Sequence, residues 1–115
     1  ARAVMRGSHK SCVIVDMPFG TYEKNPEQAF TNASRILNET ACCGVKLEGG
    51  SEMAATIHYL TSRDIPVMGH VGLLPQSVIK EGGYKIKGRN EQEEQRLLQD
   101  ARAVEEAGAF AFVIE

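Results

Sequence analysis

Ionisable side chains follow each of the apolar runs that this 115-residue sequence predicts as strands. The four predicted strands are Cys12–Val15, Gly44–Leu47, Pro66–Gly69 and Phe110–Ile114. The residues directly after them are, in chain order, Asp16, Glu48, His70 and Glu115. Active sites of parallel α/β proteins form at the carboxyl ends of the strands, because the loops converge there. We therefore expect these four side chains to meet at one rim of a sheet.

Two of these residues, Asp16 and Glu48, carry the oxygen ligands that a hard divalent cation prefers. Mg²⁺ is typically held by one or two carboxylates together with water and substrate oxygens. On neighbouring strands, Asp16 and Glu48 would be placed to share one such ion. The structural alternative for Asp16 is a strand-end cap, which Pro18 and Gly20 just behind it would favour. Two carboxylates alone do not identify a metal site.

Lys46 stands two residues before Glu48 on the same predicted strand, so the two side chains point to the same side. A buried lysine beside a buried carboxylate is costly unless it is paired or liganded. Either a Lys46–Glu48 salt bridge or a ligand would meet that cost. His70 is equally open, because it can bind a substrate carboxylate or carbonyl, or satisfy backbone groups at a strand end. His9 and His58 are predicted to be a loop residue and a helix-surface residue.

Helical patterns with recognisable starts separate the strands. The first has Asn25 as N-cap, Pro26 at the first helical position and Gln28 as a capping-box residue. Ser51 is expected to cap the second helix, and Asn90 with Glu93 the third, which Gly108 ends. The residues predicted to face the core are Ala29, Ala33, Ile36 and Leu37 in the first helix, Met53, Ile57 and Leu60 in the second, and Leu97, Ala101 and Val104 in the third.

This order, β-α-β-α-β-loop-α-β, predicts a parallel sheet joined by right-handed crossovers. Two folds fit it: about half of a (β/α)₈ barrel, which needs roughly 250 residues when complete, or an open doubly wound sheet. The connection from Gly72 to Arg89 far exceeds the about two to six residues of an ordinary βα loop. We interpret it as a lid, and a surface hairpin without function is the alternative. Residues 1–7 are expected to be the last turns of a helix, and both ends of the sequence to be cut from a longer chain.

Composition and net charge bear mainly on the partners and the compartment of the protein. The chain is 43% hydrophobic and 24% charged, with a formal net charge of −2. Neither a nucleic acid nor an anionic membrane is therefore expected as a partner. No apolar run approaches the about 20 residues needed to cross a bilayer. The three cysteines, Cys12, Cys42 and Cys43, make no disulfide framework and favour a reducing, cytoplasmic compartment, where we expect them as small buried side chains.

Five motifs are more specific than any of these features. They are Val15-Asp16-Met17-Pro18-Phe19-Gly20-Thr21-Tyr22, Val45-Lys46-Leu47-Glu48-Gly49-Gly50, residues 66–77 (PVMGHVGLLPQS), residues 83–89 (GYKIKGR), and Ala107-Gly108-Ala109-Phe110 leading to Glu115. In order and spacing the sequence resembles the ketopantoate hydroxymethyltransferase family. The resemblance implies a (β/α)₈ TIM barrel of the phosphoenolpyruvate mutase and isocitrate lyase type. Residues 1–115 would be a single domain that covers about four of its strands.

The resemblance also implies an activity. Family members transfer a one-carbon unit from 5,10-methylenetetrahydrofolate to 3-methyl-2-oxobutanoate, which gives 2-dehydropantoate (ketopantoate) for pantothenate biosynthesis, usually as decamers. Carried over, Asp16 and Glu48 would bind Mg²⁺, and Asp16, Lys46 and His70 would contact the keto acid. Glu115 would be the proton acceptor.

Further expectations concern the rest of the metal site, the burial of Glu115 and the alternative functions. A further aspartate and a neighbouring serine of the family's metal site would lie outside this sequence. Apolar Phe112 and Ile114 are expected to bury Glu115 partly, which would raise its pKa towards neutrality. The alternatives are a Mg²⁺-dependent lyase or mutase of the same superfamily acting on 2-keto acid enolates, and a non-catalytic α/β domain.

Overall fold

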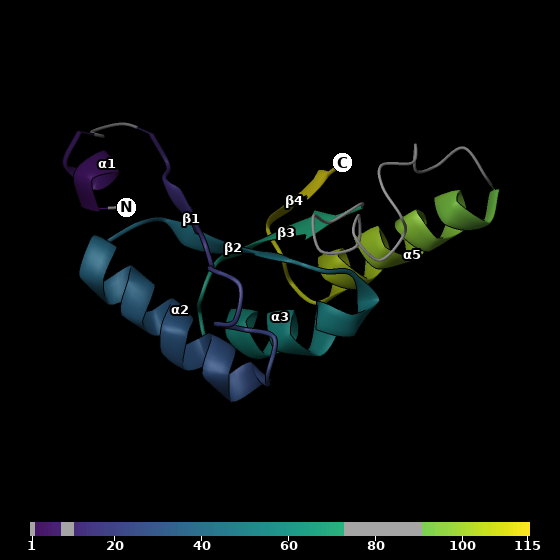
Figure 1. Cartoon of the computed structure of the whole chain (residues 1–115), viewed down its shortest axis with the longest axis horizontal. Helices are drawn as coiled ribbons and strands as arrows, with labels where there is room; N and C mark the ends of the chain where they lie inside the picture. The colour runs from purple at the N-terminus through teal and green to yellow at the C-terminus, as the bar shows by residue number, and fades with distance from the viewer. Residues whose placement is uncertain (1, 8–10, 73–90) are drawn as a thin grey trace.

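The structure, a computed structural model, describes residues 2–7, 11–72 and 91–115 (Figure 1). In chain order its elements are α1 (Arg2–Gly7), β1 (Ile14–Asp16), α2 (Pro26–Thr40), β2 (Gly44–Glu48), η1 (Ser51–Met53), α3 (Ala54–Thr61), β3 (Val67–Val71), α5 (Glu91–Glu106) and β4 (Ala111–Ile114). The four strands form one sheet in the order β1-β2-β3-β4, and every neighbouring pair is parallel. The predicted lid, residues 73–89, and His9 lie outside the described residues.

The arrangement of strands and helices favours a barrel over a doubly wound sheet. Strand order follows chain order without reversal. Helix α2 packs against α3, and α3 packs against α5, so successive crossover helices lie side by side on one face of the sheet (Figure 1). A doubly wound sheet would reverse its strand order and place helices on both faces. The fold is thus α/β, with four parallel strands arranged as in part of a (β/α)₈ barrel, whereas the extent of the domain stays a prediction.

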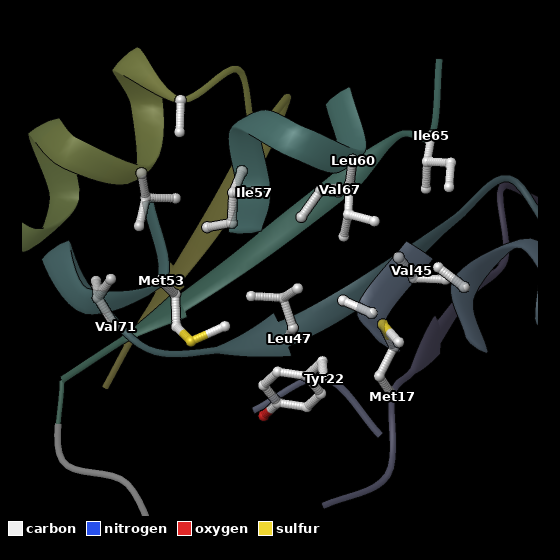
Figure 2. Packing of buried hydrophobic residues seen from close by; sticks show 14 of the residues in the cluster. Met17, Tyr22, Val45, Leu47, Met53, Ile57, Leu60, Ile65, Val67 and Val71 are labelled. Atoms are coloured by element: carbon white, nitrogen blue, oxygen red, sulfur yellow. The ribbon is translucent and has the colours of Figure 1, made fainter. Parts of the chain in front are cut away.

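One face of the sheet packs on these helices. Val45 and Leu47 of β2 and Val67 and Val71 of β3 are almost fully buried, and they lie against a helix layer (Figure 2). The residues of that layer with the least exposure all lie on the predicted helix faces: Ala29, Ala33, Ile57, Leu60 and Val104. Successive side chains of a strand point to opposite faces, so the residues between these apolar positions lie on the other side of the sheet.

The start of α2 confirms the N-cap and modifies the capping box. Asn25 Oδ1 accepts the backbone N–H of Gln28 at 2.7 Å, and Pro26 is the first helical residue. In a standard box the Gln28 side chain would accept the N–H of Asn25. Here Gln28 Oε1 accepts the N–H of Lys24 at 3.0 Å, while its Nε2 donates to Gly20 O at 3.0 Å. The glutamine therefore also ties the loop after β1 to the helix.

The second predicted cap, Ser51, is wrong. A single 3₁₀ turn precedes α3; Gly50 is the N-cap of that turn and Met53 the N-cap of α3, and neither makes a side-chain capping bond. Ser51 instead donates its N–H and its hydroxyl to Asp100 of α5. The predicted cap Asn90 of α5 lies outside the described residues, and the helix ends at Glu106, two residues before Gly108 at φ 107°.

The cysteines and the remaining histidine can be compared with their predictions. Cys42 is buried, with its Sγ 3.4 Å from Gly44 O, but Cys12 and Cys43 are exposed, so their predicted burial is wrong. Cys12 precedes β1 and Cys43 precedes β2. His58 is exposed on α3, as predicted. No helix of the described residues is long and apolar enough to cross a membrane.

Candidate functional site

The predicted site residues occupy the sheet face opposite the helices. Asp16 pairs in register with Lys46, and Glu48 pairs with His70, so these side chains share one side of the sheet. His70 is also in register with Val113 of β4, which puts Glu115, two residues further on, on the same side. One correction concerns His70, which lies inside β3 rather than after it. Strand pairing continues to Val71, where Val71 O accepts the N–H of Glu115 at 3.2 Å.

Lys46 forms its ion pair across strands. Its Nζ lies 3.0 Å from Asp16 Oδ1, with the lysine side chain 25% exposed and the aspartate 71% exposed. The structural alternative of a salt bridge to Glu48 on the same strand therefore does not describe Lys46, whose recorded partner is on β1. The pair places a cation and a carboxylate together at the end of β1, where a small anionic molecule can reach both.

His70 lies between two carboxylates from the neighbouring strands. Its Nδ1 is 3.8 Å from Glu48 Oε1, and its Nε2 is 3.3 Å from Glu115 Oε2. The imidazole is only 8% exposed, yet neither nitrogen makes an aligned hydrogen bond with the described residues. Buried polar atoms normally have partners, and those without one commonly mark a place for a ligand or water. The ring is thus available to a polar group bound between the two carboxylates.

Tyr22 is the residue at this rim that sequence reasoning missed. Its ring is 4% exposed and lies beside Leu47 at the edge of the apolar cluster (Figure 2). Its hydroxyl accepts the backbone N–H of Glu48 at 3.2 Å. Burial raises the pKa of Tyr22, the Glu48 N–H opposes that rise, and the carboxylates of Glu23, Glu48 and Asp16 add to it. Asp16 and Glu48 therefore both lie near this hydroxyl.

A signal for Tyr22 was present in the sequence. A tyrosine a few residues after a strand-end acid can bury its ring in the core and keep its hydroxyl at the rim. The loop that carries it is held by α2, because Asn32 Nδ2 donates to Thr21 O at 2.8 Å. The loop of Tyr22 is thus held by α2, and its hydroxyl is held by the Glu48 N–H of β2.

Phe112 and Ile114 do not provide the partial burial that was predicted for Glu115. Its side chain is 63% exposed. Phe112 pairs with Gly69, whose missing Cβ would point at Val104 of α5, so Phe112 and Ile114 lie on the helix side of the sheet. A strand places alternate residues on opposite faces, so neighbours at odd spacing cannot bury Glu115.

The donor types at the rim suit a hard cation. Carboxylate oxygens of Asp16 and Glu48 are the ligands that Mg²⁺ prefers, and such sites leave several positions to water and substrate. The described residues contain no group of three or more His, Cys, Asp or Glu that could hold a metal ion. A cation at this rim would therefore take at most a minority of its ligands from the described residues.

Comparisons with known proteins identify the same family along the whole chain. The family model described as ketopantoate hydroxymethyltransferase matches residues 1–115. Curated relatives named 3-methyl-2-oxobutanoate hydroxymethyltransferase are 58% identical in Sinorhizobium fredii and 61% identical in Bartonella quintana, each over 114 residues, which are 99% of this chain and 42% of the relative. A relative of the same name from Rhodospirillum centenum is 60% identical over 113 residues, 98% of this chain and 41% of its own length. The chain thus spans about two fifths of the length of these relatives.

Proposed function

The chain belongs to the ketopantoate hydroxymethyltransferase family, and we propose that the protein containing it transfers a hydroxymethyl group to 3-methyl-2-oxobutanoate. The donor is 5,10-methylenetetrahydrofolate, the product is 2-dehydropantoate, and the reaction serves pantothenate biosynthesis. Relatives of 58–61% identity that carry the name of this enzyme support the proposal. The observation that carries it furthest is the row of cation, acids and imidazole along one face of the parallel sheet.

The Asp16–Lys46 pair is suited to the charged end of the keto acid. A 2-keto acid offers a carboxylate and an adjacent carbonyl oxygen, which together match an ammonium group and a divalent cation. Lys46 Nζ, 3.0 Å from Asp16 Oδ1, can turn towards the substrate carboxylate because its partner is largely exposed. Lys46 therefore binds the substrate and neutralises the acid beside it.

Asp16 and Glu48 are the residues that would hold Mg²⁺. Glu48 ends β2 with its carboxylate 29% exposed, so it is open to an ion but sheltered from bulk water. When bound, Mg²⁺ supplies polarisation of the keto group, which makes the neighbouring C–H more acidic. Asp16 and Glu48 would hold the ion, and with it the keto group, on the same face of the sheet as Glu115.

Glu115 is the proposed base. The C3–H bond of the substrate breaks, its proton passes to a carboxylate oxygen of Glu115, and its electron pair forms the new C–C bond to the one-carbon unit of the methylene donor. The two bonds from that carbon to the nitrogens of the donor break, so that tetrahydrofolate leaves with the two hydrogens of a water molecule. The water oxygen becomes the hydroxyl oxygen of the product and receives the proton from Glu115. His70 touches this base, with Nε2 3.3 Å from Glu115 Oε2. The imidazole thus lies beside the base, and its other nitrogen faces Glu48 at 3.8 Å, next to the proposed metal ligand.

Exchange of the C3 proton tests this assignment. The full-length protein that contains this chain is incubated with Mg²⁺ and 3-methyl-2-oxobutanoate in D₂O, without folate, and deuterium incorporation is followed by proton NMR. Glu115→Gln should slow exchange by about 10²–10⁴-fold, as loss of a general base does. Glu94→Gln is the matched control, since Glu94 is exposed on α5, and it should exchange normally. Undiminished exchange by Glu115→Gln would exclude it as the base.

Two further measurements separate the alternatives. Adding the methylene donor should yield 2-dehydropantoate, whereas a lyase or mutase of the same superfamily would ignore the donor. Mg²⁺ together with the keto acid should raise the Tm of the protein, because a ligand that binds only the folded state stabilises it. An unchanged Tm would favour a non-catalytic domain. The decameric assembly and cytoplasmic location remain part of the proposal, and sedimentation of the full-length protein tests the former.

A further inference from the structure

The backbone of the turn that follows Glu48 is held by hydrogen bonds, three of them to residues in other parts of the fold. Four consecutive backbone N–H groups, from Glu48 to Ser51, each find a separate acceptor. The acceptors are Tyr22 Oη at 3.2 Å, His70 O at 3.0 Å, Glu52 Oε1 at 3.1 Å and Asp100 Oδ1 at 3.0 Å. Such a set fixes the path of the backbone directly after the residue that carries the carboxylate.

The turn needs support from distant groups because its local bonds are few: Glu52 Oε1 accepts the Gly50 N–H, and Gly50 O accepts the Met53 N–H at 2.9 Å. Gly49 adopts φ +132°, a conformation that residues with a side chain rarely take, and Gly50 also lacks a side chain. Ser51 does not cap the helix that follows it. The backbone from Glu48 to α3 therefore has the high conformational freedom of a glycine pair unless neighbouring groups restrict it.

Asp100 supplies the most distant of these restraints. It lies on α5, 49 residues away in sequence, and one oxygen accepts both the Ser51 N–H at 3.0 Å and the Ser51 hydroxyl at 2.8 Å. Hydrogen bonds to an ionised acceptor are the stronger kind. The carboxylate also sits directly on the turn, since a Cβ added to Gly50 would lie 2.2 Å from Asp100 Cγ. The glycine is thus the space that lets Asp100 approach.

We propose that Asp100 is a positioning residue for Glu48: from α5 it holds the Gly49–Ser51 turn and so directs the Glu48 carboxylate into the rim. This proposal rests on the proposed function, in which Glu48 is a metal ligand. Asp100 touches neither metal nor substrate and acts through the backbone of the turn. Groups that orient a metal ligand typically change metal affinity by about 10–100-fold when they are removed.

Mn²⁺ binding, followed by electron paramagnetic resonance of the free ion, measures the effect in the full-length protein. Asp100→Ala removes the acceptor and should weaken Mn²⁺ binding by about 10-fold. Asp100→Asn keeps an oxygen that can accept both Ser51 bonds, so its affinity should stay within about threefold of the parent. Gln99→Ala is the control on the same helix, where the exposed neighbour of Asp100 should have no effect. The Tm of each variant is measured alongside, to separate a loss of overall stability from a loss of Mn²⁺ affinity. The rescue by asparagine must appear in the Mn²⁺ affinity.

The outcomes separate this proposal from the proposed function. Normal Mn²⁺ binding by Asp100→Ala would overturn it, and so would an equal loss in Asp100→Asn, which retains the acceptor. If Asp100→Ala does not fold, Ser51→Ala removes the 2.8 Å bond alone and should weaken binding by about threefold; no weakening overturns the proposal. Glu48→Gln provides the reference. If it binds Mn²⁺ normally, the ligand assignment itself fails, whereas its loss together with normal binding by Asp100→Ala sinks only the role of Asp100.

Discussion

Removal of the Tyr22 hydroxyl should loosen the backbone at Glu48 without disturbing the core. Tyr22→Phe keeps the ring, which is 4% exposed, and deletes the oxygen that accepts the Glu48 N–H at 3.2 Å. Leaving a buried donor without a partner costs about 1–3 kcal/mol. A 3.2 Å bond is at the long end of the normal range, so we expect about 1 kcal/mol. That corresponds to about fivefold in a local opening equilibrium.

Amide hydrogen exchange at Glu48 is the direct assay, because it reports local opening at a single residue. The Glu48 amide should exchange about fivefold faster in Tyr22→Phe. Tyr59→Phe is the matched control, since Tyr59 contributes ring contacts with Phe30 and Arg63 and no recorded hydroxyl bond among the described residues. An unchanged Glu48 exchange rate in Tyr22→Phe, or an equal rise in the control, would refute the argument.

The same residue predicts a pH dependence. Burial raises the pKa of Tyr22 above its ordinary value of 10.0, so the folded state favours the protonated phenol. For a group whose folded pKa is raised, the contribution to stability is complete below the unfolded pKa and is lost as pH rises through the folded pKa. The difference between the 295 nm titrations of the parent protein and Tyr22→Phe should therefore show a phenol that ionises above pH 10.0. Ionisation at or below that value would contradict the assigned burial.

Three further predictions concern packing, thiol chemistry and the isolated chain. Gly69→Ala places a Cβ 2.5 Å from Val104 Cγ1, and the β-branched valine cannot easily turn away. Urea unfolding should show that the free energy of unfolding falls by about 1–3 kcal/mol, and Val104→Ala should partly relieve this loss. An unchanged stability of Gly69→Ala would contradict the packing. A hydrogen bond that the Cys12 thiol donates to Cys43 raises the pKa of Cys12. Iodoacetamide should therefore label Cys12 faster in Cys43→Ala, and an unchanged rate would refute the contact. Among the described residues β1 and β4 are the edge strands of the sheet, so sedimentation should show that the 115-residue chain associates. A cooperative melt as a monomer would contradict this expectation.

Local sequence signals predicted the elements and the face on which the site lies. Asn25 and Pro26 define the start of α2 without any tertiary information, because a cap satisfies backbone groups within one turn. Apolar runs that end in acids predicted parallel strands with their charged ends together. The order of the strands completed the distinction between a barrel and a doubly wound sheet, which the alternation of helices and strands left open.

The errors have two physical origins: groups elsewhere in the fold that compete for a side chain, and the alternation of side chains along a strand. Ser51 was expected to cap its own helix, but Asp100 offers a charged acceptor from 49 residues away and takes both of its donors. Glu115 was expected to be buried by Phe112 and Ile114, yet the alternation of side chains puts those two on the helix face. Gln28 Oε1 accepts the N–H of Lys24 instead of that of Asn25, while Gln28 Nε2 donates to Gly20 O in the loop after β1. Such competition cannot be read from residues that are adjacent in the chain.

The imidazole of His70 is shared between acids that arrive on two different strands. Its two nitrogens lie 3.8 Å from Glu48 and 3.3 Å from Glu115, so a side chain with a single polar atom would lie near only one of the two acids. Homologous proteins that lose this histidine should consequently differ at Glu48 or Glu115 as well, and the three positions should evolve as a linked set.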